Sequence, residues 1–279
     1  MAAPTPENTD VTSASGAEPS VILMTASASN SAASSSATSG PLLGYDGVAK
    51  CTDLQLHSGA DWLITALCAI SKCNHMWPVS NIDLAGGDIY DAISADFTTY
   101  DLTLASTTTK VKYTDAIGNI ADNNGTAWFG GGFDRAIIAM NGPGVDGGKL
   151  ITNDYSNVTA VETAGMWGLT YLTGQYAVVE NIPSNDTTWA TWMNKIDGTP
   201  VLIRTSDTPD ASLKANQYYT LSTMDGTDNM LKSDCSVVVW NPSGTGDNSY
   251  ISIPIGTLKT SSKYLYHLDW AHFFYDVSR

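Results

Sequence analysis

The run at residues 62–70 constrains the fold of this chain most strongly, because every residue in it except Thr65 is apolar. A helix that is hydrophobic on all sides is buried, and this run is too short to span a membrane. Residues 58–61 precede it and include a glycine, and Asp61 is a favourable N-cap because its carboxylate can accept backbone N–H groups. The stretch therefore predicts a central core helix that begins at a small turn.

Length and charge exclude several classes of partner. The chain has 279 residues and a formal charge of −15, from 28 acidic and 13 basic residues. Such a surface repels nucleic acid and anionic membranes, so we expect neither as a partner. The first residues lack the basic and apolar regions of a signal peptide, and the apolar run at 21–24 is too short for a membrane span. These features predict a cytoplasmic protein.

Composition and periodicity change along the chain. Residues 1–43 are rich in Ser, Ala, Thr and Pro and bury too little apolar surface to offset the entropy of ordering, so we expect a disordered N-terminal tail. After the core helix, the patterns predict more helix in the first half and antiparallel strands in the second. The expected helices are 128–140, 160–169 and 189–196, and the expected strands are 97–104, 110–113, 176–179, 201–204, 217–222, 236–240 and 250–255.

The chain has four cysteines, and their spacing suits neither a disulfide framework nor a zinc site. We expect them to be small buried hydrophobic residues. Cys68 in particular lies two turns inside the core helix and is expected to pack there. The four are Cys51, Cys68, Cys73 and Cys235.

Residues 55–62, Gln-Leu-His-Ser-Gly-Ala-Asp-Trp, resemble the nucleophile motif of calpain-type cysteine proteases, Gln-Gly-x-x-Gly-Asp-Cys-Trp. In that papain-like family the nucleophilic Cys lies at the start of the central helix, where the helix dipole lowers the pKa of the thiol. Gln55 stands in the place of the oxyanion-hole donor, and Trp62 in the place of the aromatic residue after the nucleophile. Asp61 stands in the place of the nucleophile itself.

The second half of the chain extends the resemblance. The family's catalytic His lies in a His-Ala-Tyr-Ser-Val strand, and its orienting Asn in Arg-Asn-Pro-Trp-Gly. Here Gln217-Tyr-Tyr-Thr-Leu and Trp240-Asn-Pro-Ser-Gly stand in those places. The interval from Gln217 to Asn241 is 24 residues and that from Asp61 to Gln217 is 156, both close to the family's spacing.

Further segments match the family in chain order. Trp128 with the helix around 136–139 resembles its Trp-containing helix, Leu-Thr-Gly at 172–174 resembles its Leu-Thr-Gly-Gly turn, and 269–274 resembles its closing segment. The resemblance implies an α+β fold with a papain-like calpain core. Its helical lobe would cover residues 44–172 and its antiparallel β lobe residues 173–279.

The sequence departs from the family pattern at the two positions that carry out catalysis, the nucleophile and the base. Thiol catalysis requires a polarisable nucleophile and a base that titrates near neutral pH. Asp61, which we expect to be ionised at a helix N-terminus, is neither a thiol nor a proton donor, and Gln217 does not titrate. Only Gln55 and Asn241 keep the family's residue types, so ordinary peptide hydrolysis should be absent.

These observations predict a catalytically inactive calpain-like protein that binds a protein or peptide ligand in the former substrate cleft, without a cofactor. Calcium, a trait of the family, has candidate ligands in the acidic turns 207–210 and 225–228, although neither has EF-hand spacing. The predicted cleft residues are Gln55, Asp61, Trp62, Gln217, Trp240 and Asn241.

Two alternatives remain at this stage. One is an active hydrolase with a noncanonical site, built from Cys51, His57 or Asp61. The other is a structural protein that self-associates, motivated by the low Lys and Arg content and by the Ser/Thr-rich tail.

Overall fold

The computed structural model describes residues 37–54, 56, 60–117, 127–140, 158–225, 235–244 and 249–269. The chain divides into Met1–Ser35 and Ser36–Arg279, and all described residues belong to the second unit. The predicted tail, 1–43, therefore lies mostly outside the described residues. Its last part belongs to the fold, because Leu42 and Leu43 are buried and the Leu42 N–H donates to the Ile89 carbonyl at 2.8 Å.

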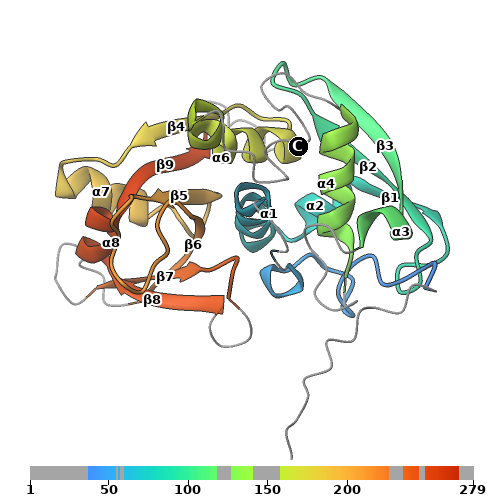
Figure 1. Ribbon diagram of the computed structural model, residues 1–279, viewed down its shortest axis with the longest axis horizontal. Helices are drawn as coiled ribbons and strands as arrows, with labels where there is room; N and C mark the ends of the chain where they lie inside the picture. The colour runs from blue at the N-terminus through green and yellow to red at the C-terminus, as the bar shows by residue number, and fades with distance from the viewer. Residues whose placement is uncertain are drawn as a thin grey trace, which may run out of the picture. The chain divides into compact units, whose positions relative to one another are not determined.

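The predicted core helix is α1, Asp61–Cys73, and every residue from Asp61 to Ser71 is buried. Figure 1 shows α1 between the six-stranded sheet on one side and helices α2 and α4 on the other. The N-cap prediction is wrong. Ala60 occupies the N-cap and Asp61 is the first helical residue, although the Asp61 Oδ1 still accepts a hydrogen bond from the Trp62 N–H at 3.1 Å.

A three-stranded antiparallel sheet follows α1, with β1 at Ile82–Gly86, β2 at Ser94–Tyr100 and β3 at Ser106–Lys112. The predicted hairpin is confirmed as β2 and β3, which pair from Ser94↔Lys112 to Tyr100↔Ser106. The short helices around it are η1, Cys51–Asp53; α2, Met76–Ser80; and α3, Tyr113–Ala116.

Helix α4, Phe129–Met140, covers this sheet and confirms the helix predicted at 128–140. Phe133 packs edge-on against Phe97 of β2, with ring centroids 5.1 Å apart. The glycines at the helix start permit this approach. A Cβ on Gly131 would lie 2.3 Å from the Ala116 carbonyl oxygen, and one on Gly132 would lie 1.9 Å from the Phe97 ring.

Helix α6, Val158–Thr173, packs against α1 and is longer than the predicted helix. Its Gly168 allows close contact, since a Cβ there would lie 3.0 Å from the Ala66 side chain and 3.1 Å from Trp62. The helix ends at Gly174, whose φ of +65° is a left-handed conformation that favours glycine.

The second sheet has six strands in the order β4-β9-β5-β6-β7-β8, all antiparallel. Five of them correspond to predicted strands, whereas β9, which lies between β4 and β5, was not predicted. Two antiparallel sheets with helices make this an α+β protein. The strands are β4, Ala177–Asn181; β5, Val201–Thr205; β6, Tyr218–Asp225; β7, Ser236–Trp240; β8, Tyr250–Pro254; and β9, Ser262–Leu268.

Hydrophobic side chains cover this sheet on both faces. On β5, Leu202 belongs to the core that contains α1 and α6, whereas Val201 and Ile203 point into a second core with Trp189 and Leu258. This alternation follows from the period of two in a strand. It explains why β5 reads as a continuous apolar run in its first three residues.

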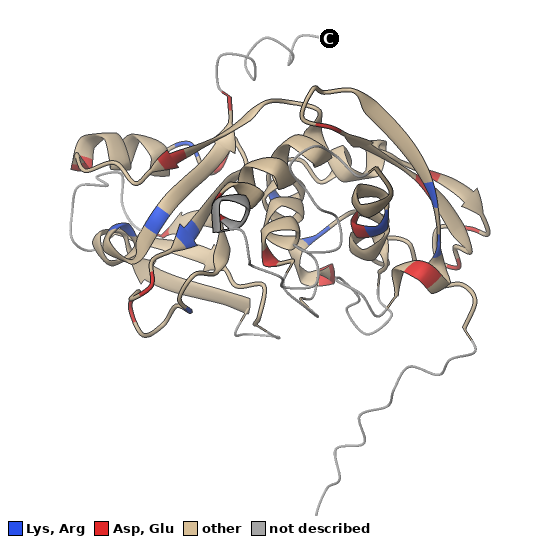
Figure 2. Cartoon of the chain, turned by 45° about the horizontal axis from the view of Figure 1, so that its top comes forward, with Lys and Arg blue, Asp and Glu red and all other residues tan. Residues whose placement is uncertain are grey.

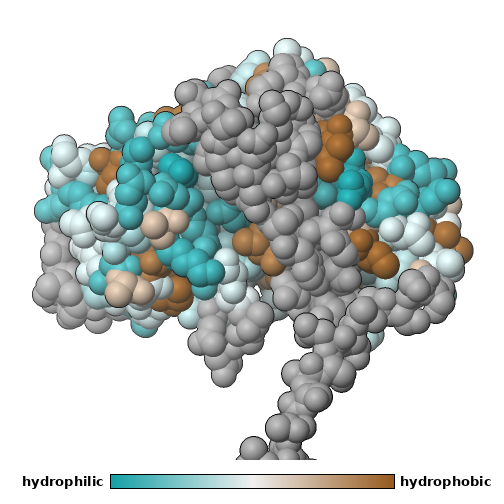
Figure 3. All heavy atoms as spheres, in the orientation of Figure 1, coloured by the Kyte–Doolittle hydropathy of each residue, from teal (hydrophilic) through white to brown (hydrophobic). Residues whose placement is uncertain are grey.

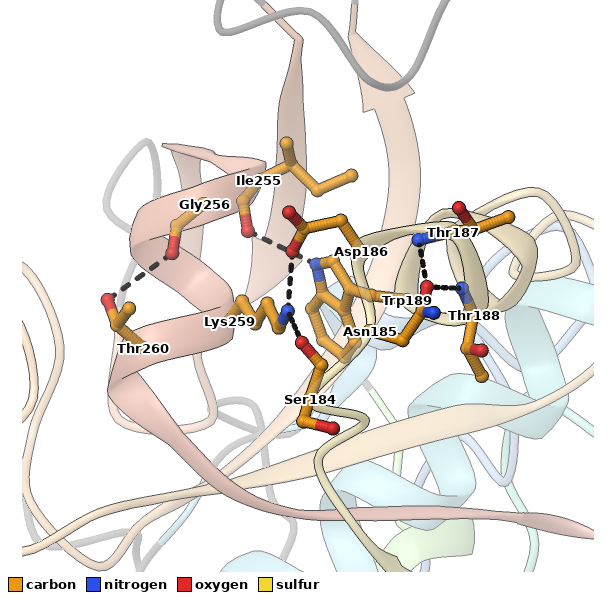
Figure 4. Close-up of polar contacts among 10 residues, drawn as sticks. All are labelled: Ser184, Asn185, Asp186, Thr187, Thr188, Trp189, Ile255, Gly256, Lys259 and Thr260. Carbon is orange, nitrogen blue, oxygen red and sulfur yellow. Dashed lines mark hydrogen bonds and ion pairs between the residues drawn. The ribbon is translucent and has the colours of Figure 1, made fainter.

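Helices α7, Asp186–Met193, and α8, Ile255–Ser261, supply the second core and are joined to each other (Figure 4). Asn185 caps α7 by accepting from the N–H groups of Thr187 at 2.7 Å and Thr188 at 3.2 Å. The Trp189 indole N–H donates to the Ile255 carbonyl at 3.2 Å, and Lys259 forms an ion pair with Asp186 at 2.5 Å.

Candidate functional site

The fold brings together three of the predicted site residues from three separate elements. Asp61 begins α1, Gln217 immediately precedes β6, and Asn241 immediately follows β7. Strands β6 and β7 are paired neighbours, and α1 packs against β6, so the three positions meet where α1 contacts this sheet.

Asp61 links α1 to β6 through its side chain. Its Oδ2 accepts a hydrogen bond from the backbone N–H of Tyr218 at 3.0 Å. One turn further along α1, the Thr220 hydroxyl donates to the Thr65 carbonyl at 2.7 Å. The Asp61 carboxylate therefore fastens the central helix to β6.

Gln217 and Asn241 bond directly to each other. The Gln217 Nε2 donates to the Asn241 Oδ1 at 3.0 Å, and the same oxygen accepts from the Ser243 N–H at 3.0 Å. The Ser243 hydroxyl in turn donates to the Gln217 Oε1 at 3.3 Å. Both amides thus have a fixed orientation and serve structural bonds, and neither can take a proton as a general base.

Sequence reasoning missed Ser243 as a member of this cluster, although it follows Asn241 in the Asn-Pro-Ser-Gly motif. It also missed the role of the Tyr218 backbone. The only available signal for Ser243 was its place two residues after Asn, which is a common turn arrangement.

Burial sets the electrostatics of Asp61, whose residue surface is 8% exposed. Loss of solvent raises the pKa of the carboxyl from 3.8 to about 6, although the N–H groups of Tyr218 and Trp62 and the charge of Arg204 favour the ionised form. Desolvation is the largest effect and opposes the ionised form that the helix start favours, but with a pKa of about 6 the Asp61 carboxyl is still mostly ionised at pH 7.

The two predicted cleft tryptophans are part of the hydrophobic core. Trp62 and Trp240 are 1% and 2% exposed, and among the described residues neither indole N–H has a hydrogen-bond partner. Asn241 is partly exposed, whereas Gln217 is buried. Gln55 and His57 lie outside the described residues.

The prediction that all four cysteines are unpaired hydrophobic residues is wrong. Cys51 and Cys68 form a disulfide that ties the segment before the core helix to the middle of that helix. Both residues are buried next to each other, a proximity that a sequence separation of 17 does not reveal. Cys51 is consequently not a thiol nucleophile, which removes one basis of the noncanonical hydrolase.

Neither of the other two cysteines is exposed, and Cys73 is a poor nucleophile. Burial raises the pKa of the Cys73 thiol to about 11. Cys73 is the last residue of α1, about 18 Å along the helix from Asp61 at 1.5 Å per residue. Cys235 is buried at 1% exposure.

Within the described part of the chain, no group of three or more His, Cys, Asp or Glu side chains is arranged to hold a metal ion. The acidic turn at 207–210 is an Asx-type turn, in which the Asp210 carboxylate accepts from the Ser212 N–H at 3.0 Å and hydroxyl at 2.7 Å. The turn at 225–228 lies outside the described residues after Asp225. Figure 2 shows the Lys and Arg residues dispersed over the described part of the chain.

None of the helices that the structure describes is long and apolar enough to cross a membrane. The chain matches no protein-family model, and no curated protein sequence matches it.

Proposed function

We propose that this protein is a catalytically inactive relative of calpain-type cysteine proteases that binds a protein or peptide segment. The observation that supports the relationship is the convergence of Asp61, Gln217 and Asn241. These residues are 156 and 24 positions apart in the sequence. They meet at the start of the core helix and at the ends of two neighbouring strands, where a papain-like protease carries its nucleophile, base and orienting amide.

The chemistry of the cluster argues against hydrolysis. The Asp61 carboxylate is engaged by Tyr218, and Gln217 lacks a proton-transfer group. In catalytic sites of this kind, loss of a single member of the nucleophile–base pair lowers the rate by several orders of magnitude. Both are replaced here, Cys51 and Cys68 are joined in a disulfide, and burial raises the pKa of the Cys73 thiol.

In place of catalysis, the cluster stabilises the junction of the lobes. Asp61 receives a hydrogen bond from Tyr218, and Thr65 receives one from Thr220. A hydrogen bond to a charged group contributes about 1.5–3 kcal/mol and a neutral one about 1 kcal/mol. Selection for such bonds would retain the scaffold after the catalytic residues had changed.

One observation supports a binding role at the same place. Asn241 and Ser243 are partly exposed at the edge of the cluster, beside the buried Gln217. An extended peptide presents carbonyl and N–H groups at regular intervals, and partly exposed polar side chains at such an edge can form hydrogen bonds with them.

The disulfide bears on the compartment. Disulfides persist mainly in oxidising environments, so Cys51–Cys68 favours such a compartment over the cytoplasmic location predicted from composition.

Self-association of the protein remains a prediction. On the face in Figure 3, hydrophobic residues form separate patches among hydrophilic ones.

A two-part assay tests this function. Wild-type protein is incubated with a library of fluorescence-quenched peptides to measure cleavage, and extended peptides are screened for binding by fluorescence polarisation. We expect binding without cleavage. The variant Ser243→Trp places a bulky side chain at the exposed edge of the cluster and should weaken binding at least about tenfold, which is 1.4 kcal/mol.

The matched control is Ser252→Trp on β8, outside the cluster, which should leave peptide affinity unchanged. Cleavage by the wild type would contradict the inactive assignment. If no peptide binds, or if both Trp variants weaken binding equally, the proposed ligand site is wrong.

A further inference from the structure

A cavity lies away from the Asp61 cluster and includes none of the residues of that cluster. Its volume is about 420 Å³, within the range of small-molecule sites in proteins. One wall comes from residues 48–52, another from Ser71 and Lys72 near the end of α1, and Tyr250 of β8 closes a third side. The cavity therefore draws on the first described segment, the core helix and the edge of the six-stranded sheet.

The lining of this cavity is basic, unlike the chain as a whole. It includes Lys50, Lys72 and His75 and no acidic residue among the described ones. The whole chain, by contrast, has a formal charge of −15 with only 13 Lys and Arg. Basic side chains at a cavity wall favour an anion over a cation as ligand.

Both lysines have acidic neighbours outside the lining. Lys50 forms an ion pair with Asp46, with both side chains about half exposed, and it also interacts with the charge of Asp53. Lys72 donates to the Ile196 carbonyl at 2.7 Å and to Asp197 at 3.3 Å. An ammonium group has three donors, so Lys72 keeps one for a ligand, and the solvent-exposed Lys50 pair can exchange at little cost.

Ser71 provides an independent indication of a ligand. It is 4% exposed, it lines the cavity, and its Oγ has no hydrogen-bond partner among the described residues. A serine hydroxyl within a helix commonly bonds to the carbonyl four residues earlier. This one does not, and it remains a buried donor at a cavity wall that also carries two lysines.

Besides Cys51 and the polar Thr52, the rest of the lining is apolar or aromatic. Val48 and the nearly fully buried Ala49 are aliphatic, and Tyr250 is 41% exposed. An aromatic ring of the ligand could pack on these groups while its charge faced the lysines. A purely inorganic anion would leave this surface unused.

We propose that this cavity binds a small organic anion, a carboxylate on an aromatic body. The carboxylate accepts hydrogen bonds from Lys50, Lys72 and the Ser71 hydroxyl, and the ring packs against Val48, Ala49 and Tyr250. The site is independent of the proposed peptide-binding function, since the two share no residue.

Sodium benzoate is used as the test ligand for this cavity, and benzamide, which has a similar shape but no charge, is the control. Calorimetric titration of the purified full chain should show benzoate binding at least about tenfold more tightly than benzamide, because charge-assisted hydrogen bonds are roughly twice as strong as neutral ones. Lys50→Gln and Ser71→Ala should each weaken benzoate about threefold to tenfold. Lys112→Gln, which removes an exposed charge from β3, should leave the affinity unchanged.

Three results would overturn the proposal. The first is no detectable benzoate binding up to about 10 mM, where even the weak affinities of small fragments are measurable. The second is equal affinity for benzoate and benzamide. The third is a loss of benzoate affinity in Lys112→Gln as large as that in Lys50→Gln, which would indicate a general charge effect. Near-UV circular dichroism of each variant verifies that it is folded.

Discussion

Removal of the Cys51–Cys68 disulfide should lower the stability of the protein by a calculable amount. The bond closes a loop with a sequence separation of 17 residues. In the chain-entropy treatment, a cross-link over a loop of that length removes about 10 cal/mol/K from the unfolded state, or about 3 kcal/mol at 25 °C. The double variant Cys51→Ser/Cys68→Ser also buries two hydroxyl groups, so its loss should be at least that large.

Urea unfolding followed by tryptophan fluorescence measures this effect. With an m-value of about 3 kcal/mol/M, a loss of 3 kcal/mol lowers the unfolding midpoint by about 1 M. Dithiothreitol should shift the wild-type midpoint in the same direction. Cys73→Ser, which keeps the disulfide, should retain most of the wild-type stability. A wild-type midpoint that does not respond to reductant would refute the pairing of Cys51 with Cys68.

Two further predictions concern burial and packing. Burial raises the pKa of Asp134, whose side-chain oxygens have no partner among the described residues, from 3.8 to about 7. The folded state therefore binds this proton more tightly than the unfolded state, and stability falls by up to about 4 kcal/mol as pH rises from about 4 to about 7. Asp134→Asn should remove that part of the pH dependence in urea unfolding, and an unchanged slope would show that the carboxyl is not desolvated. Gly132→Ala should destabilise the protein by about 1–3 kcal/mol, because its Cβ would lie 1.9 Å from the Phe97 ring. Gly256→Ala on α8 meets nothing within 4 Å and should instead stabilise the helix by up to about 1 kcal/mol; equal melting temperatures for the two variants would contradict the packing of α4 on β2.

Features with a strong local pattern could be predicted from the sequence. The core helix is apolar on every face, and β7 at Ser236–Trp240 coincides with its predicted range. Asp61, Gln217 and Asn241 were singled out only through a family resemblance, which stays a prediction, because no local pattern brings together residues that are 156 and 24 positions apart.

Features that depend on tertiary contacts could not be predicted from the sequence. Strand β9 is buried on both faces, because Tyr266 packs into the core that contains α1 and α6 and Leu265 into the core that contains Trp189 and Leu258. The Cys51–Cys68 disulfide could not be predicted, because the sequence does not show that η1 lies next to α1. The raised pKa of Asp61 follows from burial between α1 and β6, whereas the sequence shows only its place at a helix start.

The most direct test of the central claim, a protease scaffold without its nucleophile and base, is restoration of both. Wild type, Asp61→Cys and Asp61→Cys/Gln217→His are treated with a peptidyl epoxide and analysed by intact mass, after circular dichroism has verified folding. The account predicts one label per molecule on the double variant, slow labelling of Asp61→Cys and none on the wild type. A labelled wild type would reveal a reactive nucleophile, and a folded but unlabelled double variant would contradict the assignment of these positions to a protease site.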